Sequence, residues 1–361
     1  MNGALVDQPG QPPVAVIGVD GGNSKVDLAL VAEDGTLLAA VRGPTISHQA
    51  RGGFVAAVAS LRVTLAAALD LARDRASTAV SVAGASSAPA GGPIARVAVF
   101  SVAGADTPRD VRRLRVAFER LGVAQRLIIV NDAYGALRAG TDDGVGAVVI
   151  CGSGSNMLAI GPSGRVARYP ALGEIAGDWG GGGSLGPAAL SAAIRGRDGR
   201  GPRTSLERLV PERLGLTRPL DVTYALYRGR LSSNAIRDLA PLVFEAAGEG
   251  DAVARFIIDQ QADEVVVMAV AALRQARALR AAVPVVLAGG IFRTTDASFH
   301  ARIRAGLAAA APRAEIRRLE APPVVGAALL GLEALGLDGP AAARLRATLV
   351  DEAIVRAGPQ R

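Results

Sequence analysis

The feature that most constrains the fold is a pattern found once in each half of the chain: an apolar strand, a tip rich in glycine, and a second apolar strand. In the first half, residues 15–19 and 26–31 are rich in β-branched residues and flank the tip DGGNSK. In the second half, residues 146–151 and 157–160 flank the tip GSGS. Glycine permits a tight turn and leaves backbone N–H groups uncovered, as a bound phosphate requires. Either hairpin alone could be an ordinary exposed β-hairpin, but two similar halves favour a repeated phosphate-binding unit.

The rest of the chain alternates between helical and strand patterns, which indicates an α/β protein. We expect helices over residues 53–75, 109–121, 133–139 and 323–335, strands over residues 94–102, 127–130 and 284–288, and a small-residue loop over residues 81–93. A Gly-dense stretch over residues 173–186 precedes a long helical region that runs to about residue 282. The length of 361 residues favours two domains. We place a tail over residues 1–13, an N-terminal domain over residues 14–130, and a C-terminal domain with a helical insertion over residues 131–361.

Composition narrows the classes of function. The net charge of +7 could suggest a nucleic acid partner, but the arginines are interleaved with acidic residues and have no aromatic platforms beside them, so we expect none. The single cysteine, Cys151, excludes a disulfide framework and a cysteine-ligated cluster, and we expect it in the core. No signal core is evident, and no run approaches about 18 apolar residues. We therefore expect a soluble, cytoplasmic protein without a membrane partner.

Four groups of polar or glycine residues follow predicted strands: residues 20–25, Asn131-Asp132, residues 152–155 and Gly289-Gly290-Ile291. In this order and spacing they resemble the actin/hexokinase/Hsp70-like ATPase superfamily. Within it, the chain is similar to the N-acetylglucosamine kinase family, grouped with the BadF/BadG-type ATPases, from residue 14 to about residue 337. The most specific piece is VNDAYGALRAGTDDGVGAVVICGSGSNMLAIGPSGRV, followed by GEIAGDWGGGGSLG. The resemblance implies an α/β fold of two ribonuclease-H-like domains with a cleft between them.

The resemblance also implies ATP and Mg²⁺ as cofactors. Asp20 resembles the carboxylate that holds Mg²⁺, directly or through water. The nucleotide-binding residues would be Gly21, Gly22, Asn23, Ser24, Lys25, Gly152, Ser153, Gly154, Ser155, Gly289 and Gly290, with the last two on the adenosine side. Lys25 is the only lysine in the chain, and it could equally be a solvated strand residue.

On the sugar side, Asp132 resembles the catalytic base that takes the proton from the sugar 6-hydroxyl. It could instead only cap the helix that follows it. The substrate-binding residues would be Ser47, His48, Gly104, Asn131, Asp132, Glu174 and Asp178. For these, too, simpler readings stay open: His48 could be merely exposed, and Asp178 could brace a Gly-rich turn. Trp179 is expected to pack rather than to stack on a sugar.

The chain departs from the family pattern around the sugar. Animal N-acetylglucosamine kinases carry an Asn where this chain has Ser47, an aromatic residue where it has Gln49, and Asp-Glu-Gly where it has Asp178-Trp179-Gly180. We therefore expect an ATP-dependent kinase for the 6-hydroxyl of an amino sugar, of the glucosamine or N-acetylglucosamine type. A kinase of another hexose or a cyclitol, a non-kinase BadF-type ATPase and a sugar sensor are the alternatives. A homodimer is compatible with the sequence.

Overall fold

The computed structural model describes residues 14–79 and 92–357. The predicted N-terminal tail and nearly all of the loop expected over residues 81–93 lie outside this part. The chain divides into two compact units, one made of residues 1–142 and 320–361 and the other of residues 143–319. This division differs from the predicted one at Asn131. The segment that carries α3 (Asp132–Gly140) and the last helices of the chain pack with the first unit, because α3 and α11 (Val324–Ala334) contact each other and α11 also contacts β1 and β4.

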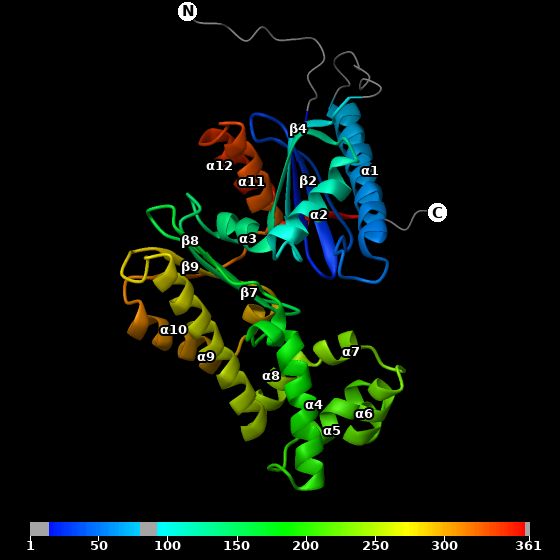
Figure 1. Cartoon of the computed structure of the whole chain (residues 1–361), viewed down its shortest axis with the longest axis vertical. Coiled ribbons are helices and arrows are strands. Elements are labelled where there is room, and N and C mark those ends of the chain that lie inside the picture. Colours follow the sequence, from blue (N-terminus) through cyan, green and yellow to red (C-terminus); the bar gives the residue numbers. More distant parts are fainter. Residues whose placement is uncertain (1–13, 80–91, 358–361) are drawn as a thin grey trace, which may run out of the picture. The chain divides into compact units, whose positions relative to one another are not determined.

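The first unit is built on a six-stranded sheet in the order β11-β3-β2-β1-β4-β5. Figure 1 labels two of its strands, β2 and β4. Its strands are β1 (Val14–Gly21), β2 (Lys25–Val31), β3 (Leu37–Pro44), β4 (Ala95–Val102), β5 (Ala124–Asn131) and β11 (Val355–Arg356). β1 and β2 form the predicted hairpin, and β1, β4 and β5 run parallel. The other helices of this unit are α1 (Gly53–Ala79), α2 (Pro108–Glu119) and α12 (Pro340–Thr348), with the short 3₁₀ helix η3 (Asp351–Ala353).

The second unit is built on a five-stranded sheet in the order β10-β9-β6-β7-β8. Its strands are β6 (Gly146–Cys151), β7 (Ser155–Ile160), β8 (Val166–Arg168), β9 (Pro284–Ala288) and β10 (Glu315–Arg318). Its helices are η1 (Gly173–Ala176), α4 (Gly182–Asp198), α5 (Leu206–Arg213), α6 (Pro219–Tyr227), α7 (Ser233–Arg237), α8 (Ala240–Gly248), α9 (Ala252–Gln275), η2 (Gly290–Arg293) and α10 (Ala297–Ala310). The long helical region expected up to residue 282 is therefore several helices. Positive-φ glycines interrupt it, among them Gly199 at +83° and Gly229 at +68°.

The two sheets repeat one topology. In chain order, strands β1 to β5 of the first unit occupy the same relative places as β6 to β10 of the second, since β3-β2-β1-β4-β5 and β8-β7-β6-β9-β10 are the same order. β6 pairs antiparallel with β7 and parallel with β9, as β1 does with β2 and β4. The two glycine-rich tips are thus equivalent positions of a duplicated sheet, as the sequence pattern predicts.

Helix α1 differs from the other described helices in its length and apolar composition. Among the described residues, it is the one helix that is long and apolar enough to cross a membrane, over Gly53–Ala76, although the sequence was expected to contain no such run. It contacts β2 and β3 and contributes Ala57, Leu61 and Ala68 to the core of the first unit. Core helices of globular domains pass the same length and hydropathy test, so this is weak evidence for a membrane span.

Candidate functional site

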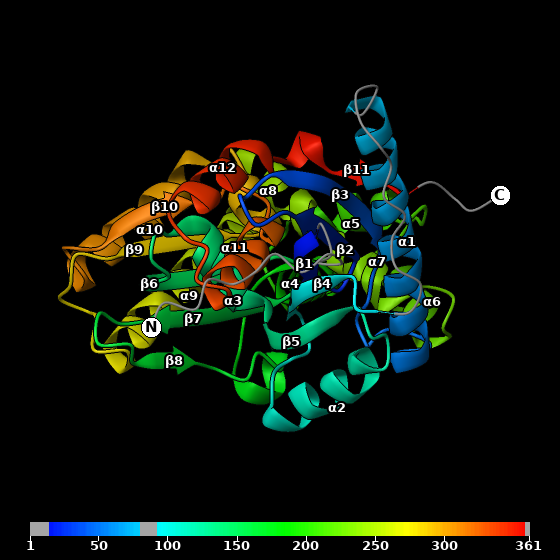
Figure 2. The same ribbon diagram turned by 90° about the horizontal axis from the view of Figure 1, so that it is seen from above.

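The carboxyl ends of three parallel strands meet at one edge of the first sheet. β1 pairs with β4 so that Asp20 lies opposite Ser101, and β4 pairs with β5 so that Val102 lies opposite Asn131. The three strands lie side by side (Figure 2). Asp132 begins α3 directly after β5. Open α/β sheets bind ligands at the carboxyl ends of their strands, so this edge is where a ligand is expected.

Asp20 lies in a strongly perturbed electrostatic environment at this edge. Its pKa is raised from 3.8 to about 8, first by burial and then by the charges of Asp132 and Asp27. Lys25 and Arg42 act in the opposite direction with smaller effects. A bound cation would offset both the burial and the repulsion between carboxylates. Asp20 therefore has the chemistry expected of the predicted Mg²⁺ ligand.

The donor set is small for a metal held by protein alone. Among the residues that the structure describes, no group of three or more His, Cys, Asp or Glu side chains is arranged to hold a metal ion. Mg²⁺ is commonly held by one or two carboxylates together with substrate phosphates and water. The residues present at this edge fit that mode of binding, in which most ligands of Mg²⁺ come with the nucleotide.

The tip between β1 and β2 is a tight turn with an exposed end. The N–H of Gly22 donates to the carbonyl of Lys25 at 2.9 Å, and Asn23 and Ser24 are exposed. A Cβ atom on Gly21 would lie 2.7 Å from Val102 Cγ1, so the tip can lie this close to β4 only with glycine there.

Lys25 is ion-paired within the sheet, although its side chain is 42% exposed. Its Nζ donates to Asp27 Oδ2 at 2.8 Å, and the fully buried Asp27 also accepts two hydrogen bonds from Arg42, at 2.7 and 2.9 Å. Asp27 lies directly opposite Asp20 across the β1–β2 pair. The lysine therefore belongs to an ion-pair cluster beside Asp20, and its contact with nucleotide stays a prediction.

The loop that follows β3 is hydrogen-bonded to the tip. Thr45 Oγ1 donates to the carbonyl of Gly22 at 2.7 Å, and Ser47 Oγ donates to Asn23 Oδ1 at 3.1 Å. Ser47 is only 5% exposed. The predicted sugar-binding loop and the predicted phosphate tip are thus one connected structure, in which the Ser47 hydroxyl already has an internal acceptor.

His48 is half-buried and is stacked on Phe54, with ring centroids 4.7 Å apart and 19° between the planes. Its Nδ1 is buried without a hydrogen-bond partner among the described residues. The pKa of His48 is lowered mainly by burial and also by Arg113, while Asp110 opposes the shift. Gly104 has φ +81°, and a Cβ there would lie 2.8 Å from His48 Cε1. The structure therefore brings His48 and Gly104 together, and an unpaired ring nitrogen is suited to a polar ligand.

Asn131 and Asp132 have different places at the start of α3. Asn131 is the N-cap: its Oδ1 accepts from the N–H of Ala133 at 3.1 Å, and its Nδ2 donates to Asp106 Oδ1 at 2.9 Å. Asn131 is 2% exposed, and Asp132 is half-buried. The cap that was the alternative role of Asp132 is therefore supplied by its neighbour. The roles of Asp132 as base and of Asn131 as sugar ligand stay predictions.

In the second unit, the tip after β6 is joined to the Gly-dense stretch before α4. The N–H of Gly182 donates to the carbonyl of Gly152 at 2.8 Å, and that of Gly183 to the carbonyl of Ser153 at 2.7 Å. A Cβ on Gly181, which has φ +68°, would lie 2.5 Å from the carbonyl oxygen of Gly154. The two glycine-rich segments form one surface of backbone, and only small residues allow this approach.

The predicted adenosine-side glycines lie at the same edge of the second sheet. Gly289 follows β9, which is paired with β6, and a Cβ on it would lie 2.2 Å from the carbonyl oxygen of Cys151. A Cβ on Gly290 would meet nothing within 4 Å, so its surroundings are open. The structure thus brings the pair Gly289-Gly290 next to the tip that begins at Gly152.

Cys151 is in the core, as expected. It is fully buried, burial raises the pKa of its thiol to about 12, and its Sγ accepts from Gln261 Nε2 at 3.7 Å. Gln261 Oε1 accepts from the N–H of Gly181 at 2.8 Å, so the same amide holds the Gly-dense stretch.

The acidic residues predicted for sugar binding lie at η1 in the second unit. Asp178 Oδ2 accepts from the N–H of Gly173 at 3.1 Å, which is the bracing role considered as its alternative. Glu174 is exposed, and its side chain makes no hydrogen bond or ion pair with the described residues. Trp179 is half-buried and packs against the core of this unit, which agrees with the packing role.

Sequence reasoning missed two buried acidic residues of the first unit, Asp27 and Asp106. Asp27 could have been found from the hairpin register, because a tight turn at residues 22–24 places it opposite Asp20. Asp106 lies in the loop between β4 and α2, and only the packing of that loop on β5 reveals its contact with Asn131.

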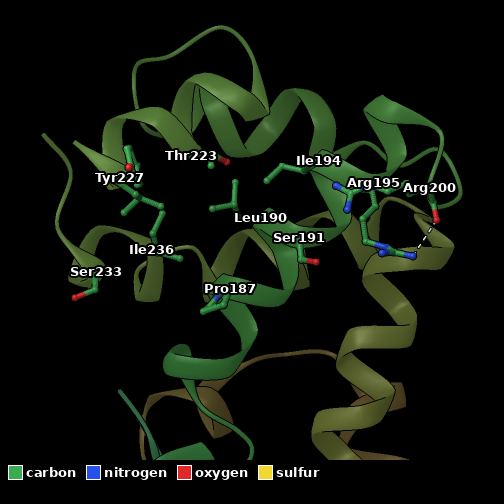
Figure 3. A pocket seen from close by; sticks show the side chains of 11 residues that line it. Pro187, Leu190, Ser191, Ile194, Arg195, Arg200, Thr223, Tyr227, Ser233 and Ile236 are labelled. Carbon is green, nitrogen blue, oxygen red and sulfur yellow. Dashed lines mark hydrogen bonds between the residues drawn. The ribbon is translucent and has the colours of Figure 1, made fainter. Parts of the chain in front are cut away.

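A cavity of about 600 Å³ lies in the second unit, among α4, α6 and α7 (Figure 3). Its lining includes Leu190, Ile194, Leu226 and Ile236. None of the predicted site residues lines it. Its volume is in the range of ligand pockets, but its lining contains no residue of the two strand-end groups described above.

Known proteins show which family has these features. The chain is 31% identical over 197 residues to the N-acetylmuramic acid/N-acetylglucosamine kinase of Clostridium acetobutylicum. The aligned region spans 55% of this chain and 64% of that protein. It is 29% identical over 248 residues to the N-acetyl-D-glucosamine kinase of Dictyostelium discoideum, and this aligned region spans 67% of this chain and 74% of that protein. The chain therefore covers slightly less than two thirds of the clostridial relative.

A solved structure has the same fold. It is described as an N-acetylglucosamine kinase from Chromobacterium violaceum, with a TM-score of 0.65 and 26% sequence identity, and the match covers 89% of this chain and all of that one. The predicted fold class and family resemblance are confirmed. The family match itself extends over residues 17–331, and the chain belongs to the BadF/BadG/BcrA/BcrD ATPase family.

Proposed function

We propose that this protein is an ATP-dependent kinase that transfers the γ-phosphoryl group to the 6-hydroxyl of an amino sugar, of the glucosamine or N-acetylglucosamine type. The observation that carries the proposal is the placement of Asp20 and Asp132 at one strand-end edge of the first sheet, which also carries the glycine tip. A base, a ligand for a cation and a phosphate-binding turn are the parts that phosphoryl transfer requires. The names of the relatives agree with this activity.

In this proposal each residue has a limited task. Asp132 accepts the proton of the attacking hydroxyl, which a carboxylate can do because the proton leaves late in phosphoryl transfer. The tip residues Gly21 to Ser24 approach the phosphates, and their backbone N–H groups hold phosphate oxygens, except that of Gly22, which donates to the carbonyl of Lys25. Mg²⁺ bound at Asp20 would neutralise charge on the phosphates. Ser47, His48 and Gly104 form the wall nearest the tip, where we expect the sugar.

Two alternatives belong to other classes of function. An ATPase that drives electron transfer through an iron–sulfur cluster needs accessible cysteine ligands, and the single cysteine of this chain is fully buried with a raised pKa. A sugar sensor would bind the sugar without turnover. A kinase of another hexose or of a cyclitol differs only in substrate.

The test is ADP release by the purified full chain with Mg²⁺ and ATP, over a panel of glucosamine, N-acetylglucosamine, glucose, N-acetylmannosamine and inositol. We expect release that depends on an amino sugar and a product that carries phosphate on C6 by NMR. ADP release without sugar dependence would favour a non-kinase ATPase, and sugar binding by calorimetry without release would favour a sensor. Turnover of only a neutral hexose or a cyclitol would correct the substrate class and leave the kinase assignment standing.

A further inference from the structure

The cavity among α4, α6 and α7 of the second unit has no role in the proposed function. Its volume of about 600 Å³ is within the range of cavities that hold small molecules (Figure 3). In its floor, Leu190 and Ile236 are buried members of the core of the second unit. Ile194 and Leu226 are half-buried and pack against the same core. The floor is therefore apolar surface of that core, which the three helices leave uncovered.

The walls of this cavity are held in place by contacts among the helices. α4 contacts both α6 and α7. A Cβ on Gly186 of α4 would lie 1.9 Å from the carbonyl oxygen of Ile236 in α7, so only glycine allows this close approach. After α6, the N–H groups of Arg230 and Leu231 both donate to the carbonyl of Ala225, at 2.8 and 3.1 Å. Because the walls are fixed in this way, a ligand that enters the cavity has little to order.

One end of the cavity is positively charged. Arg195 and Arg200 lie together there, and none of the described residues that line the cavity is acidic (Figure 3). Arg200 is paired with Asp198 at 2.7 Å. Arg195 donates from Nη2 to the carbonyl of Arg200 at 2.9 Å, and it makes no ion pair with any residue that the structure describes. Two guanidinium groups and one carboxylate leave one positive charge in excess at this end.

An apolar floor with one excess cation at its end suits an amphipathic anion. Apolar surface favours a hydrocarbon chain, and a guanidinium with unused N–H donors favours a carboxylate through charge-assisted hydrogen bonds. We propose that this cavity binds a medium-chain carboxylate, with its chain along Leu190, Ile194 and Leu226 and its carboxylate at Arg195. Ser191 lies one turn before Arg195 on the same face of α4, so its hydroxyl can donate to the second carboxylate oxygen. No residue of the proposed kinase site takes part in this binding.

The first experiment measures the binding of decanoate to the full chain by calorimetry, below the concentration at which the probe forms micelles. Decan-1-ol and decyltrimethylammonium have the same chain length and serve as neutral and cationic probes. We expect decanoate to bind at one site, about tenfold or more tightly than either of them, because only the carboxylate pairs with Arg195. Equal binding of all three probes would reflect hydrophobicity alone and would overturn the proposal, as would the absence of binding.

Variants separate the charged end from the apolar floor. Arg195→Gln should weaken decanoate by about tenfold and leave decan-1-ol within about twofold. Arg197 is an exposed arginine of the same helix that does not line the cavity, so Arg197→Gln is the matched control and should bind decanoate as the parent does. Equal weakening in the two variants would show a general effect of charge and would overturn the proposal. Ser191 is exposed at the rim, so Ser191→Trp should block both probes without lowering the melting temperature. Unchanged decanoate binding in this variant would place the probe elsewhere.

Hydrogen exchange and the oligomeric state complete the test. Decanoate should slow amide exchange over residues 187–195 and 223–236, and protection over residues 20–25 or 152–155 in their place would overturn the proposal. A dimer that dissociates in Ser191→Trp, measured by analytical ultracentrifugation, would show that a second copy of the chain covers the cavity and would also overturn it. Decanoate binding by a protein without sugar-dependent turnover would support this site and reject the proposed kinase. Sugar-dependent turnover without decanoate binding would do the reverse.

Discussion

Asp20 at the end of β1 and Asp132 at the start of α3 lie close enough for the charge of Asp132 to be the largest contribution, after burial, to the raised pKa of Asp20. Two carboxylates at one edge of a sheet repel each other in the absence of a cation, and a cation bound near them relieves that repulsion. In the proposed function this pair would supply a cation ligand and a proton acceptor, which are separate tasks in phosphoryl transfer. Replacing each member by asparagine therefore produces different results.

Asp20→Asn should abolish stabilisation by Mg²⁺-ATP. The substitution removes the charge that attracts the cation, and because it also removes a repulsion it should not lower the melting temperature of the ligand-free protein. Saturation at about 100 times Kd stabilises a folded protein by about 2.7 kcal/mol, which is measurable as a shift in a thermal melt. Asp198→Asn, at an exposed pair with Arg200, is the control. A variant at Asp20 that keeps the full shift with Mg²⁺-ATP would show that Asp20 does not hold the metal.

Asp132→Asn should leave ATP binding within about twofold and lower kcat by about 10²–10⁴-fold, the range for loss of a general base. The helix itself should be preserved, since Asn131 is its N-cap. Steady-state kinetics with a saturating sugar, with a melt to confirm folding, is the measurement. A kcat within a few-fold of the parent would mean that another group accepts the proton.

Gly289→Ala should be far more harmful than alanine at a positive-φ glycine in open surroundings. Gly289 has φ +104°, and a Cβ there would lie 2.2 Å from the carbonyl oxygen of Cys151. Gly199 also has a positive φ, +83°, but a Cβ there would meet nothing within 4 Å. Gly199→Ala reports the strain of a left-handed residue, about 1–2 kcal/mol. Gly289→Ala adds the crowding against Cys151 and the larger strain of its φ +104°, ψ 168° backbone, a conformation that is essentially restricted to glycine. We expect KM for ATP to rise only in Gly289→Ala, and equal effects would argue against a nucleotide site here.

His48 should make the first unit less stable in mild acid. Burial and Arg113 lower its pKa while Asp110 raises it, and the net shift is downward from 6.5. Below about pH 6.5 the unfolded chain therefore binds a proton that the folded chain does not, so stability falls as the pH falls; above that pH this effect is absent.

The measurement is the melting temperature of the parent minus that of His48→Gln, at pH 7.5 and pH 5.5. Taking the difference removes other groups that titrate in this range, Asp20 among them. The difference should be smaller at the lower pH, because only the parent carries the unfavourable histidine. A difference that is constant or larger at pH 5.5 would mean that the folded state accepts the proton on His48 readily.

The strand-end groups could be predicted because each consists of consecutive residues after an apolar run. The tip after Asp20, the pair Asn131-Asp132 and the glycines at 289–290 are of this kind, and all three lie where the strand pattern places them. The repeated topology follows from the same local signals. Strand β3 was not predicted because its apolar run, LLAAV, does not alternate apolar with polar residues and leads directly into the turn residues Arg-Gly-Pro.

What the sequence could not provide is the pairing of side chains that are distant along the chain. The Ser47 hydroxyl faces Asn23, and the Asp106 carboxylate faces Asn131, and neither pair has a sequence signature. The division into two compact units differs from the predicted boundary for the same reason. The small residues Gly135 and Gly326 let α3 and α11 approach so closely that a Cβ on Gly326 would lie 1.8 Å from the carbonyl oxygen of Gly135. Because of this contact, the segment that begins at residue 320 packs with the first unit.

Asp178→Asn separates the two roles considered for that residue. Its Oδ2 accepts from the N–H of Gly173, and the amide oxygen of asparagine can do the same, so the turn should be kept while the negative charge is lost. If Asp178 and Glu174 face the sugar, they favour a cationic amine over a neutral acetamide through charge-assisted hydrogen bonds. We then expect kcat/KM for glucosamine to fall by about tenfold in Asp178→Asn, a loss of about 1.4 kcal/mol, with a smaller change for N-acetylglucosamine. Glu174→Gln, on an exposed side chain of the same turn, should act in the same direction. Equal effects on the two sugars, or none, would restrict Asp178 to bracing the turn.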